Sequence, residues 1–472
     1  MPRSPVRPLA ALAVLALAAA APAAAQGAPD TTLVARYRAD ANRLIHAALA
    51  DSAAWNRTAK LTDTFGHRLS GSASLERSLD WILDEMRRDG LENVRGEPVM
   101  VPHWVRGAES ATLLTPRETP LHMIGLGSSV GTPPEGVTAD VLVVRDLEEL
   151  DRRSAEAAGK IVVFDQPFST YSQTVRYRSA GPQAAARYGA VGVLIRSVSS
   201  YSIQNPHTGN MRYEAGPNAR RIPAAALSVE DAMMLHRMAG RGERIRMRLV
   251  MGAQTLPDAP SRNVVAEIRG RERPDEVVIV SGHIDSWDVG VGAMDDAGGA
   301  VAAWEAVRLM KQLGLRPRRT VRVVMWTNEE NGVRGGRGYR EAHAAELGKH
   351  VLAIESDNGV FRPNGFRYDG PAGLLDISRR VGQLLETVGA GQVSPGETET
   401  DTEPIGEAGV PTMGLDVDGT KYFWFHHSSG DTMDKLDPRE MAQCVAAMAV
   451  MAYVVADLPD DLTHPVRAPA AP

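Results

Sequence analysis

The sequence of 472 residues contains one cysteine, Cys444, so no disulfide can form within the chain. Cys444 lies in a segment whose apolar residues recur at helical spacing, which predicts a buried core position. An excess of positive charge is also lacking, because the formal net charge is −6. Nucleic-acid-binding proteins usually carry a basic surface. We therefore expect no nucleic-acid partner.

The N-terminal segment has the pattern of a secretory signal peptide. Arg3 and Arg7 form its charged start, an apolar stretch runs from Leu9 to Ala21, and Ala23 to Ala25 provide a cleavage site of the A-x-A type. The apolar stretch is short for a membrane span, although a retained anchor is the alternative. We expect residues 1–25 to be removed, which leaves a periplasmic or secreted protein without membrane attachment.

The length predicts two or three structural units. A helix is expected over Thr32–Ala54, an amphipathic helix ends near Gly90, and a strand follows around Val99–Trp104. From about Thr115 onward, short β-rich runs and an Ala-rich helix at Gln183–Tyr188 form a block without clustered metal-ligand residues. We interpret this block as a domain inserted between two parts of a catalytic domain.

After Asp258, apolar runs alternate with helical patterns, which predicts an α/β sheet with parallel character. The expected strands are Glu276–Ser281, Thr320–Trp326 and Val351–Ile354, and the expected helices are Gly298–Leu313 and Arg337–Leu347. Ligands bind such sheets at the carboxyl ends of the strands. The expected parts of the mature chain are a first catalytic segment (30–115), the insert (116–255), a second catalytic segment (256–460) and a disordered tail (461–472).

Residues that commonly bind metal ions follow these strands. His283 and Asp285 alternate after the strand that ends at Ser281, so one can bind a metal while the other supports it. Asp295 and Asp296 open the next helix, where one Asp is expected as a cap and the second suggests a carboxylate that bridges two cations. A polar surface turn and capping alone are the alternatives for these two pairs.

Two further strand ends carry carboxylates, and a histidine pair comes later. Glu329 and Glu330 point in different directions, so one can bind a metal while the other acts as a general base. Asp357 follows the next strand, where Glu355 competes with it as a ligand, and His426-His427 stands in an aromatic segment. A solvated acidic turn, a strand-end turn and a structural histidine pair are the alternatives. Imidazole and carboxylate ligands suit zinc, so the residues predict a metallohydrolase with two metals.

Two other features of the sequence, residues 127–131 and Asp401, each have two interpretations. Residues 127–131 match the G-x-S-x-G pattern of serine hydrolases, in which a helix must follow the serine. Pro133 and Pro134 follow here and prevent that helix, so we interpret the match as fortuitous. Asp401 is left open between a supporting position behind the ligands and the wall of a substrate pocket.

Taken in order, these motifs resemble the zinc exopeptidase family of aminopeptidase Y and glutamate carboxypeptidase II, and within it the branch of plasma glutamate carboxypeptidase. The similar segments are Phe65–Ser72, Ser281–Gly299, Asn328–Asn331, Glu355–Asp357 and Tyr422–Thr432. The insert resembles a protease-associated domain, most clearly at Ala184–Ile195. The resemblance implies a three-layer α/β/α domain with a mixed, largely parallel central sheet, plus the inserted protease-associated α/β domain.

The resemblance also implies two zinc ions per chain and a role for each residue. The five implied ligands are His283 and Asp357 on one ion, Glu330 and His427 on the other, and Asp295 bridging both. The three implied catalytic residues are Glu329 as general base, Asp285 orienting His283, and His426 at the oxyanion. His426 stands where many relatives have a tyrosine, and His427 is preferred as the ligand because it lies four residues before Asp431.

The expected function is that of a secreted exopeptidase with two zinc ions. It would hydrolyse short peptides or dipeptides with a metal-bridged hydroxide and Glu329 as the base. The alternatives are a zinc amidohydrolase acting on non-peptide acyl-amines and a non-catalytic binding protein on the same fold. Short peptides are the expected partners, and a homodimer is suggested by the resemblance alone. The peptide terminus that is recognised is left open.

Overall fold

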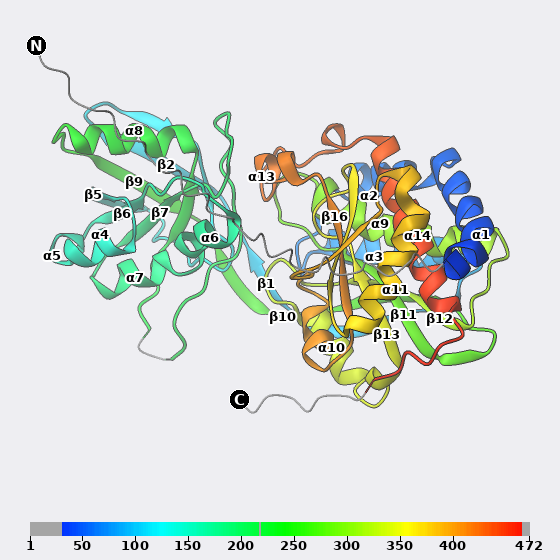
Figure 1. Ribbon diagram of the computed structural model, residues 1–472. Helices are drawn as coiled ribbons and strands as arrows, with labels where there is room; N and C mark the ends of the chain where they lie inside the picture. Colours follow the sequence, from blue (N-terminus) through cyan, green and yellow to red (C-terminus); the bar gives the residue numbers. More distant parts are fainter. Residues whose placement is uncertain (1–30, 217–218, 465–472) are drawn as a thin grey trace, which may run out of the picture.

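The computed structural model describes residues 31–216 and 219–464, which form two lobes, each built on an eight-stranded sheet (Figure 1). The expected signal peptide, residues 1–25, lies outside the described residues, as does the expected tail from residue 465. Residues 461–464 of that tail are described, and Nε2 of His464 lies 2.7 Å from the backbone oxygen of His350.

The sheet of the larger lobe has the order β1-β10-β12-β11-β13-β16-β14-β15. Its four central strands, from β12 to β16 in this order, run parallel, and antiparallel pairs flank them. The strands are β1 (Glu92–Val105), β10 (Gln254–Ile268), β11 (Arg273–His283), β12 (Arg319–Trp326), β13 (His350–Glu355), β14 (Pro363–Asp369), β15 (Gln392–Pro395) and β16 (Thr412–Val417).

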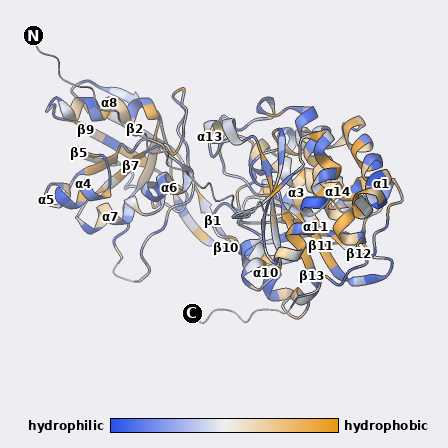
Figure 2. Ribbon diagram, viewed as in Figure 1, coloured by the Kyte–Doolittle hydropathy of each residue, from blue (hydrophilic) through white to orange (hydrophobic). Residues whose placement is uncertain are grey.

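Helices cover both faces of this sheet, which gives three layers. The larger core lies under α1, α2, α3, α9 and α14, and a smaller core lies under α10 and α12. The helices are α1 (Thr31–Ala50), α2 (Ala53–Phe65), α3 (Ala73–Arg88), α9 (Gly298–Gln312), α10 (Arg334–Ala342), α11 (Ala372–Gly382), α12 (Glu403–Glu407), α13 (Tyr422–Phe425) and α14 (Pro438–Asp457). Val278 and Val280 face the larger core and Ile279 faces the smaller one, so β11 is apolar on both sides (Figure 2).

Helix α14 is long and apolar enough to cross a membrane, but almost all of it is buried inside the larger lobe. It packs against α1, α9 and the sheet, so we interpret it as a core helix. Cys444 lies in this helix, is fully buried and donates a hydrogen bond from Sγ to the backbone oxygen of Phe361 at 3.1 Å. The predicted core position of Cys444 is confirmed.

The smaller lobe contains the sheet β3-β2-β9-β5-β6-β7-β8-β4, in which β5 to β8 run parallel. Its strands are β2 (Glu109–Thr115), β3 (Thr119–Leu121), β4 (Met123–Gly125), β5 (Val137–Val144), β6 (Ile161–Phe164), β7 (Gly192–Arg196), β8 (Ala224–Leu227) and β9 (Arg246–Met251). Its helices are α4 (Leu147–Arg152), α5 (Ser154–Ala157), α6 (Tyr171–Ser179), α7 (Gly181–Arg187) and α8 (Val229–Gly240). The antiparallel ribbon of β1 and β10 joins the two lobes (Figure 1).

The predicted fold class, a mixed α/β architecture with a largely parallel centre, is confirmed, but some element bounds were wrong. The single helix expected over residues 32–54 ends at Ala50, because Asp51 accepts a hydrogen bond from the Ala53 backbone at 2.7 Å and turns the chain into α2. The helix expected over residues 337–347 runs instead from Arg334 to Ala342. Helix α6 was not predicted, because its sequence is polar and has no apolar stripe.

The serine-hydrolase pattern does not form a nucleophile elbow. Ser129 is buried, and its Oγ accepts a hydrogen bond from the backbone N–H of Ala224 at 2.9 Å. The described residues 130–136 contain no helix. The interpretation of this match as fortuitous agrees with the structure.

Candidate metal centre

His283 is the last residue of β11 and lies at the carboxyl ends of the parallel strands, fully buried. Its Nδ1 lies 3.0 Å from the backbone oxygen of Asp285, a contact that places the ring proton on Nδ1. The lone pair of Nε2 is then free, and Nε2 lies 3.1 Å from Oδ1 of both Asp295 and Asp357. This arrangement of imidazole and carboxylates is suited to binding a metal ion.

Asp285 supports His283 through its backbone rather than through its carboxylate. The nearer carboxylate oxygen is 3.8 Å from Nδ1 of His283. The carboxylate instead accepts hydrogen bonds from the backbone N–H of Glu329 at 3.0 Å and of Glu330 at 3.4 Å. Asp285 therefore couples the end of β11 to the turn after β12, a contact that sequence spacing did not predict.

The two adjacent aspartates have different partners. Asp296 accepts hydrogen bonds from the backbone N–H of His283 at 3.1 Å and of Gly299 at 3.1 Å, so it caps the start of α9. Asp295 directs Oδ1 towards His283 and Oδ2 towards the histidine pair. Its two oxygens thus face two separate groups of potential ligands, the geometry that a bridging carboxylate needs.

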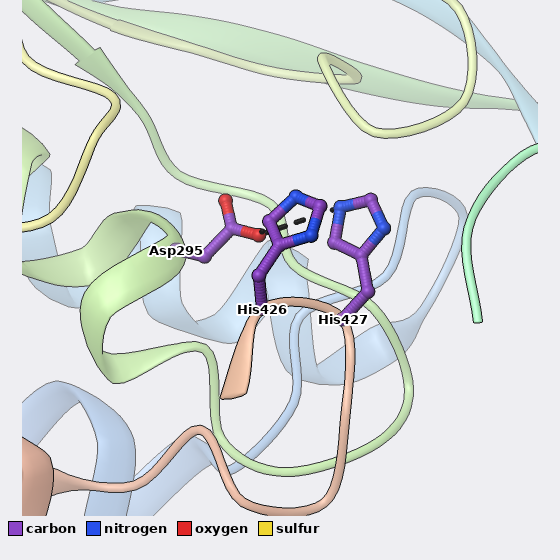
Figure 3. Close-up of side chains that lie close together, drawn as sticks. All are labelled: Asp295, His426 and His427. Carbon is purple, nitrogen blue, oxygen red and sulfur yellow. Dashed lines mark ion pairs between the residues drawn. The ribbon is translucent and has the colours of Figure 1, made fainter. Parts of the chain in front are cut away.

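The histidine pair lies on the other side of Asp295 (Figure 3). Nε2 of His426 lies 3.5 Å from Oδ2 of Asp295, and Nε2 of His427 lies 3.4 Å from the same atom. Only His427 also contacts Glu330 in the described residues, with 2.9 Å between Nε2 and Oε2. The rings of the pair are stacked with centroids 3.5 Å apart. Burial holds the pKa of both histidines well below the usual range, which keeps the rings neutral.

Two other acidic residues were candidates beside Asp357. Glu355 accepts a hydrogen bond from the Thr402 backbone at 3.1 Å and is not among the residues within reach of Nε2 of His283. Asp401 is fully buried, and in the described part of the chain neither of its carboxylate oxygens has a hydrogen-bond partner. Asp401 is not among the residues that line the cleft described below.

Glu329 is partly buried and lines the cleft beside the candidate ligands. Burial and the negative charges of Asp357 and Asp285 raise the pKa of Glu329 to about 8. A carboxylate whose protonated form is accessible near neutral pH can both take up and release a proton. The position fits a general acid–base group.

The donor set fits divalent cations. Two groups have ligand atoms within 4.8 Å of one another: Asp295 with His426 and His427, and His283 with Asp296 and Asp357. Oδ2 of Asp295 and Oε2 of Glu330 are buried, and no hydrogen-bond donor among the described residues reaches them. Buried carboxylate oxygens without a donor are costly unless a cation neutralises them. Imidazole nitrogens together with carboxylate oxygens are the ligands that zinc takes.

Arg68 stabilises the loop between His283 and Asp295 and was not assigned a role from the sequence. Its side chain is fully buried and donates hydrogen bonds to the backbone oxygens of Ile284 at 2.7 Å, Val291 at 2.7 Å and Gly292 at 2.9 Å. Burial lowers the pKa of Arg68 to about 10. Such a contact set cannot be read from spacing, because it joins α2's C-terminal turn to a distant loop.

The smaller lobe reaches the site through three contacts that sequence reasoning also missed. Nη1 of Arg178, in α6, lies 3.3 Å from Nδ1 of His427. Nδ1 of His207 lies 2.6 Å from the backbone oxygen of His426. The backbone N–H of Thr208 donates to the backbone oxygen of His427 at 2.8 Å. The histidine pair is therefore held between the two lobes.

A cleft of about 590 Å³ opens at the candidate metal centre and is bounded by both lobes. The smaller lobe contributes Tyr171 and Arg178, and the larger lobe contributes the candidate ligands together with Tyr422 and Phe423. A cleft of this size admits a small ligand such as a short peptide.

Comparison with known proteins shows consistent similarities. The model of peptidase family M28 matches residues 263–452. Carboxypeptidase Q from Bos taurus is 50% identical over 413 residues, which cover 88% of this chain and 87% of that protein. Carboxypeptidase Q from Homo sapiens is 49% identical with the same coverage.

Solved structures agree with these sequence matches. A peptidase M28 precursor from Shewanella amazonensis SB2B superimposes with a TM-score of 0.88 at 33% identity, covering 92% of this chain and 99% of that one. A zinc aminopeptidase from Bacillus subtilis superimposes with a TM-score of 0.64 at 19% identity, covering 87% of this chain and 98% of that one, a likeness of fold.

Proposed function

This chain belongs to peptidase family M28 and is a zinc metallopeptidase, and we propose that it is a secreted exopeptidase that hydrolyses dipeptides and other short peptides with two zinc ions. The observation that carries the proposal is Asp295, whose two oxygens face His283 on one side and the histidine pair on the other. The curated carboxypeptidase Q relatives, about half identical over most of the chain, support the exopeptidase assignment.

We assign the zinc ligands by contact. His283 and Asp357 would hold one ion, Glu330 and His427 the other, and Asp295 would bridge both. Zinc ions bound there would polarise the scissile carbonyl and lower the pKa of a water molecule. A residue behind the ligands also contributes, because the backbone oxygen of Asp285 holds the ring proton of His283 on Nδ1.

The proton transfers are assigned to Glu329. Its side chain lines the cleft and makes no hydrogen bond in the described part of the chain that would compete with a proton transfer. It would take the proton of the attacking water and pass it to the leaving amine. His426 is assigned to the oxyanion, because it is buried, neutral and 3.5 Å from Asp295 without contacting Glu330.

Export and the nature of the smaller lobe complete the proposal. The N-terminal pattern of Arg3, Arg7 and the following apolar stretch supports secretion with cleavage after residue 25. The smaller lobe is proposed to be a protease-associated domain, supported by its place between β1 and β10 and by the resemblance at residues 184–195. Its contacts with the histidine pair suggest that it shapes the substrate cleft.

Mass spectrometry of peptide mixtures tests the function. The mature chain from residue 26, loaded with zinc, would be incubated with free dipeptides, with longer free peptides and with peptides blocked at either end. Cleavage of dipeptides, or of single residues from free ends, is expected, and the Glu329→Gln variant serves as the matched inactive control. Absence of cleavage in every peptide would contradict the proposal. Hydrolysis of N-acyl amines alone would point to an amidohydrolase.

A further inference from the structure

Arg178 is a buried cation of the smaller lobe that lies at the metal centre. It belongs to α6, and only 7% of its surface is exposed. Nη2 donates a hydrogen bond to the hydroxyl of Tyr171 at 2.7 Å, and Nη1 lies 3.3 Å from the backbone oxygen of Thr208. Its Nε is buried and has no hydrogen-bond partner within the ranges that the structure describes. The guanidinium is thus positioned by neutral groups and keeps unused donors.

No acidic residue of the described part of the chain forms a direct ion pair with Arg178. Within residues 31–216 and 219–464, no carboxylate oxygen lies within 4.0 Å of its guanidinium nitrogens. Arg322, a buried arginine of the larger lobe, does have such a partner in Glu267 at 2.7 Å. Arg68 has none among the described residues, but backbone oxygens satisfy its guanidinium. A buried charge without a counter-charge is unfavourable, so an arginine that is kept unpaired at a cleft is expected to meet an anionic ligand.

The contact with His427 leaves a further donor free when metal is bound. Nε2 of His427 faces Asp295 and Glu330, and Nδ1 faces Arg178. With Nε2 bound to a metal ion, the ring proton must be on Nδ1, and Nδ1 can then accept no hydrogen bond from Arg178. Nη1 therefore keeps a hydrogen available for another acceptor.

Acidic and basic residues are unevenly distributed between the two cavities that Arg178 lines. The cavity of about 590 Å³ at the metal centre is lined by several acids, among them Glu397, Glu399 and Asp416 beyond the candidate ligands, and by Arg367, which pairs with Asp416 at 3.4 Å. Arg178 also lines a neighbouring cavity of about 900 Å³ together with Arg212, Arg334 and Arg337. Glu329 and Glu330 line both cavities, so the reaction site lies at the boundary between acidic and basic surroundings.

From this arrangement we infer that Arg178 binds the terminal carboxylate of the peptide substrate, so that the smaller lobe selects substrates with a free C-terminus one residue beyond the scissile bond. The inference rests on the proposed peptidase function. Arginine presents a planar fork of N–H donors that matches a carboxylate. The amino group of the same substrate would lie towards the acidic side of the cleft.

The position of Arg178 sets the length of the substrate on this side. The guanidinium is separated from the atom that faces the candidate metal, Nε2 of His427, by the 3.3 Å contact to Nδ1 and the width of the ring. One extended residue spans about 3.3–3.6 Å. The carboxylate of the first residue after the scissile bond would therefore lie beside the guanidinium of Arg178. A longer peptide would place an uncharged backbone amide opposite Arg178. The geometry therefore favours dipeptides over longer chains.

The test compares a free dipeptide with the same dipeptide carrying a C-terminal amide. In the zinc-loaded wild-type chain, kcat/KM should be at least about 10-fold higher for the free dipeptide. Arg178→Gln should lower kcat/KM for the free dipeptide by about 10- to 100-fold and change that for the amide by less than about 3-fold. Arg178→Lys should retain part of the preference. Arg176→Gln, an exposed arginine of the same helix, is the matched control and should change neither value.

Equal losses on the two substrates, or a loss of zinc from Arg178→Gln measured by plasma mass spectrometry, would overturn the inference in favour of a structural role. A wild-type chain that does not distinguish the two substrates would also overturn it. Calorimetric binding of both peptides to the Glu329→Gln variant, with and without Arg178→Gln, gives a readout that does not need turnover. Failure of the wild-type chain to cleave either peptide would contradict the proposed function, whereas a carboxylate preference in binding would still support the role of Arg178.

Discussion

The carboxylate of Asp431 holds the backbone of Asp295, with Oδ2 accepting the Asp295 N–H at 3.2 Å. Its other oxygen accepts the N–H groups of Ala293 at 2.9 Å and Met294 at 2.8 Å. Asp431 also lies four residues after His427 on the same loop. One side chain therefore couples the loop of the histidine pair to the turn that presents the proposed bridging carboxylate.

Asp431→Asn should weaken both the turn and the metal site. An amide can accept at one end only, so one or two of the three backbone N–H groups would lose their partner, with a cost of about 1–3 kcal/mol in the free energy of unfolding. Urea denaturation and competition with a zinc chelator measure the two effects. Asp434→Asn, an exposed residue of the same loop, is the control. Unchanged stability and zinc affinity in Asp431→Asn would show that this contact has no such role.

Glu329→Gln should abolish turnover while zinc stays bound. The variant keeps the shape of the side chain and removes its ability to accept a proton, and general acid–base catalysis contributes about 100- to 10,000-fold to rate. Dipeptide hydrolysis and zinc content would be measured on the same sample. Activity close to wild type would exclude Glu329 as the base.

The variants His427→Ala and His426→Ala should show which histidine is the zinc ligand and which is the catalytic residue. Of the two histidines, only His427 contacts Glu330 in the described part of the chain, at 2.9 Å, so its loss should lower the zinc content of the chain. His426→Ala should keep its zinc and lose mainly kcat, because the variant lacks a donor for the oxyanion. Metal analysis together with steady-state kinetics decides between them. The opposite pattern would make His426 the ligand.

Removal of zinc should inactivate the chain and lower its stability. Several buried carboxylates of the site, including Asp295 and Glu330, have oxygens without a donor among the described residues, and a cation would neutralise their charge. Dialysis against a chelator should lower the midpoint of thermal unfolding, and titration with zinc should restore activity as two equivalents bind per chain. Full activity with one equivalent would support the single-metal alternative.

Because of His350, the free energy of unfolding should be lower in mild acid than at neutral pH. Its Nδ1 lies 3.1 Å from the backbone oxygen of Glu346 and its Nε2 lies 2.8 Å from the hydroxyl of Tyr339, contacts that suit the neutral ring. Burial, with the nearby charge of Arg322, lowers the pKa of His350 to about 3.

Between this value and the unfolded pKa of about 6.5, the unfolded chain binds the proton and the folded chain does not. The stabilising contribution of the neutral ring is therefore complete above pH 6.5 and is lost as the pH falls towards 3. Urea unfolding of chelator-treated protein gives the free energy of unfolding at pH 7 and at pH 5. Between these two pH values, this free energy should decrease less for His350→Gln than for wild type. The exposed His46→Gln should behave as wild type, and equal decreases for all three proteins would contradict the role of His350.

Much of the fold and of the candidate site could be predicted from local patterns. The strands of the larger lobe are buried on both faces, so they read as continuous apolar runs, and polar residues directly after such runs must lie at the carboxyl edge of a parallel sheet. His283, Asp295 and Glu330 were therefore placed near one another by their neighbours in sequence, and the structure brings them together.

The sequence by itself determined which residue types gather at the strand ends, because burial and strand direction leave a local pattern. Only the tertiary structure decided how they contact: that Asp285 acts through its backbone oxygen, that Asp296 caps α9, and that Asp431 holds the turn of Asp295. Arg178 was missed for the same reason, since it reaches His427 from a helix 249 residues earlier in the chain. Such contacts depend on how distant segments pack within the larger lobe and, for Arg178, on how the two lobes dock, and neither leaves a periodicity in the sequence.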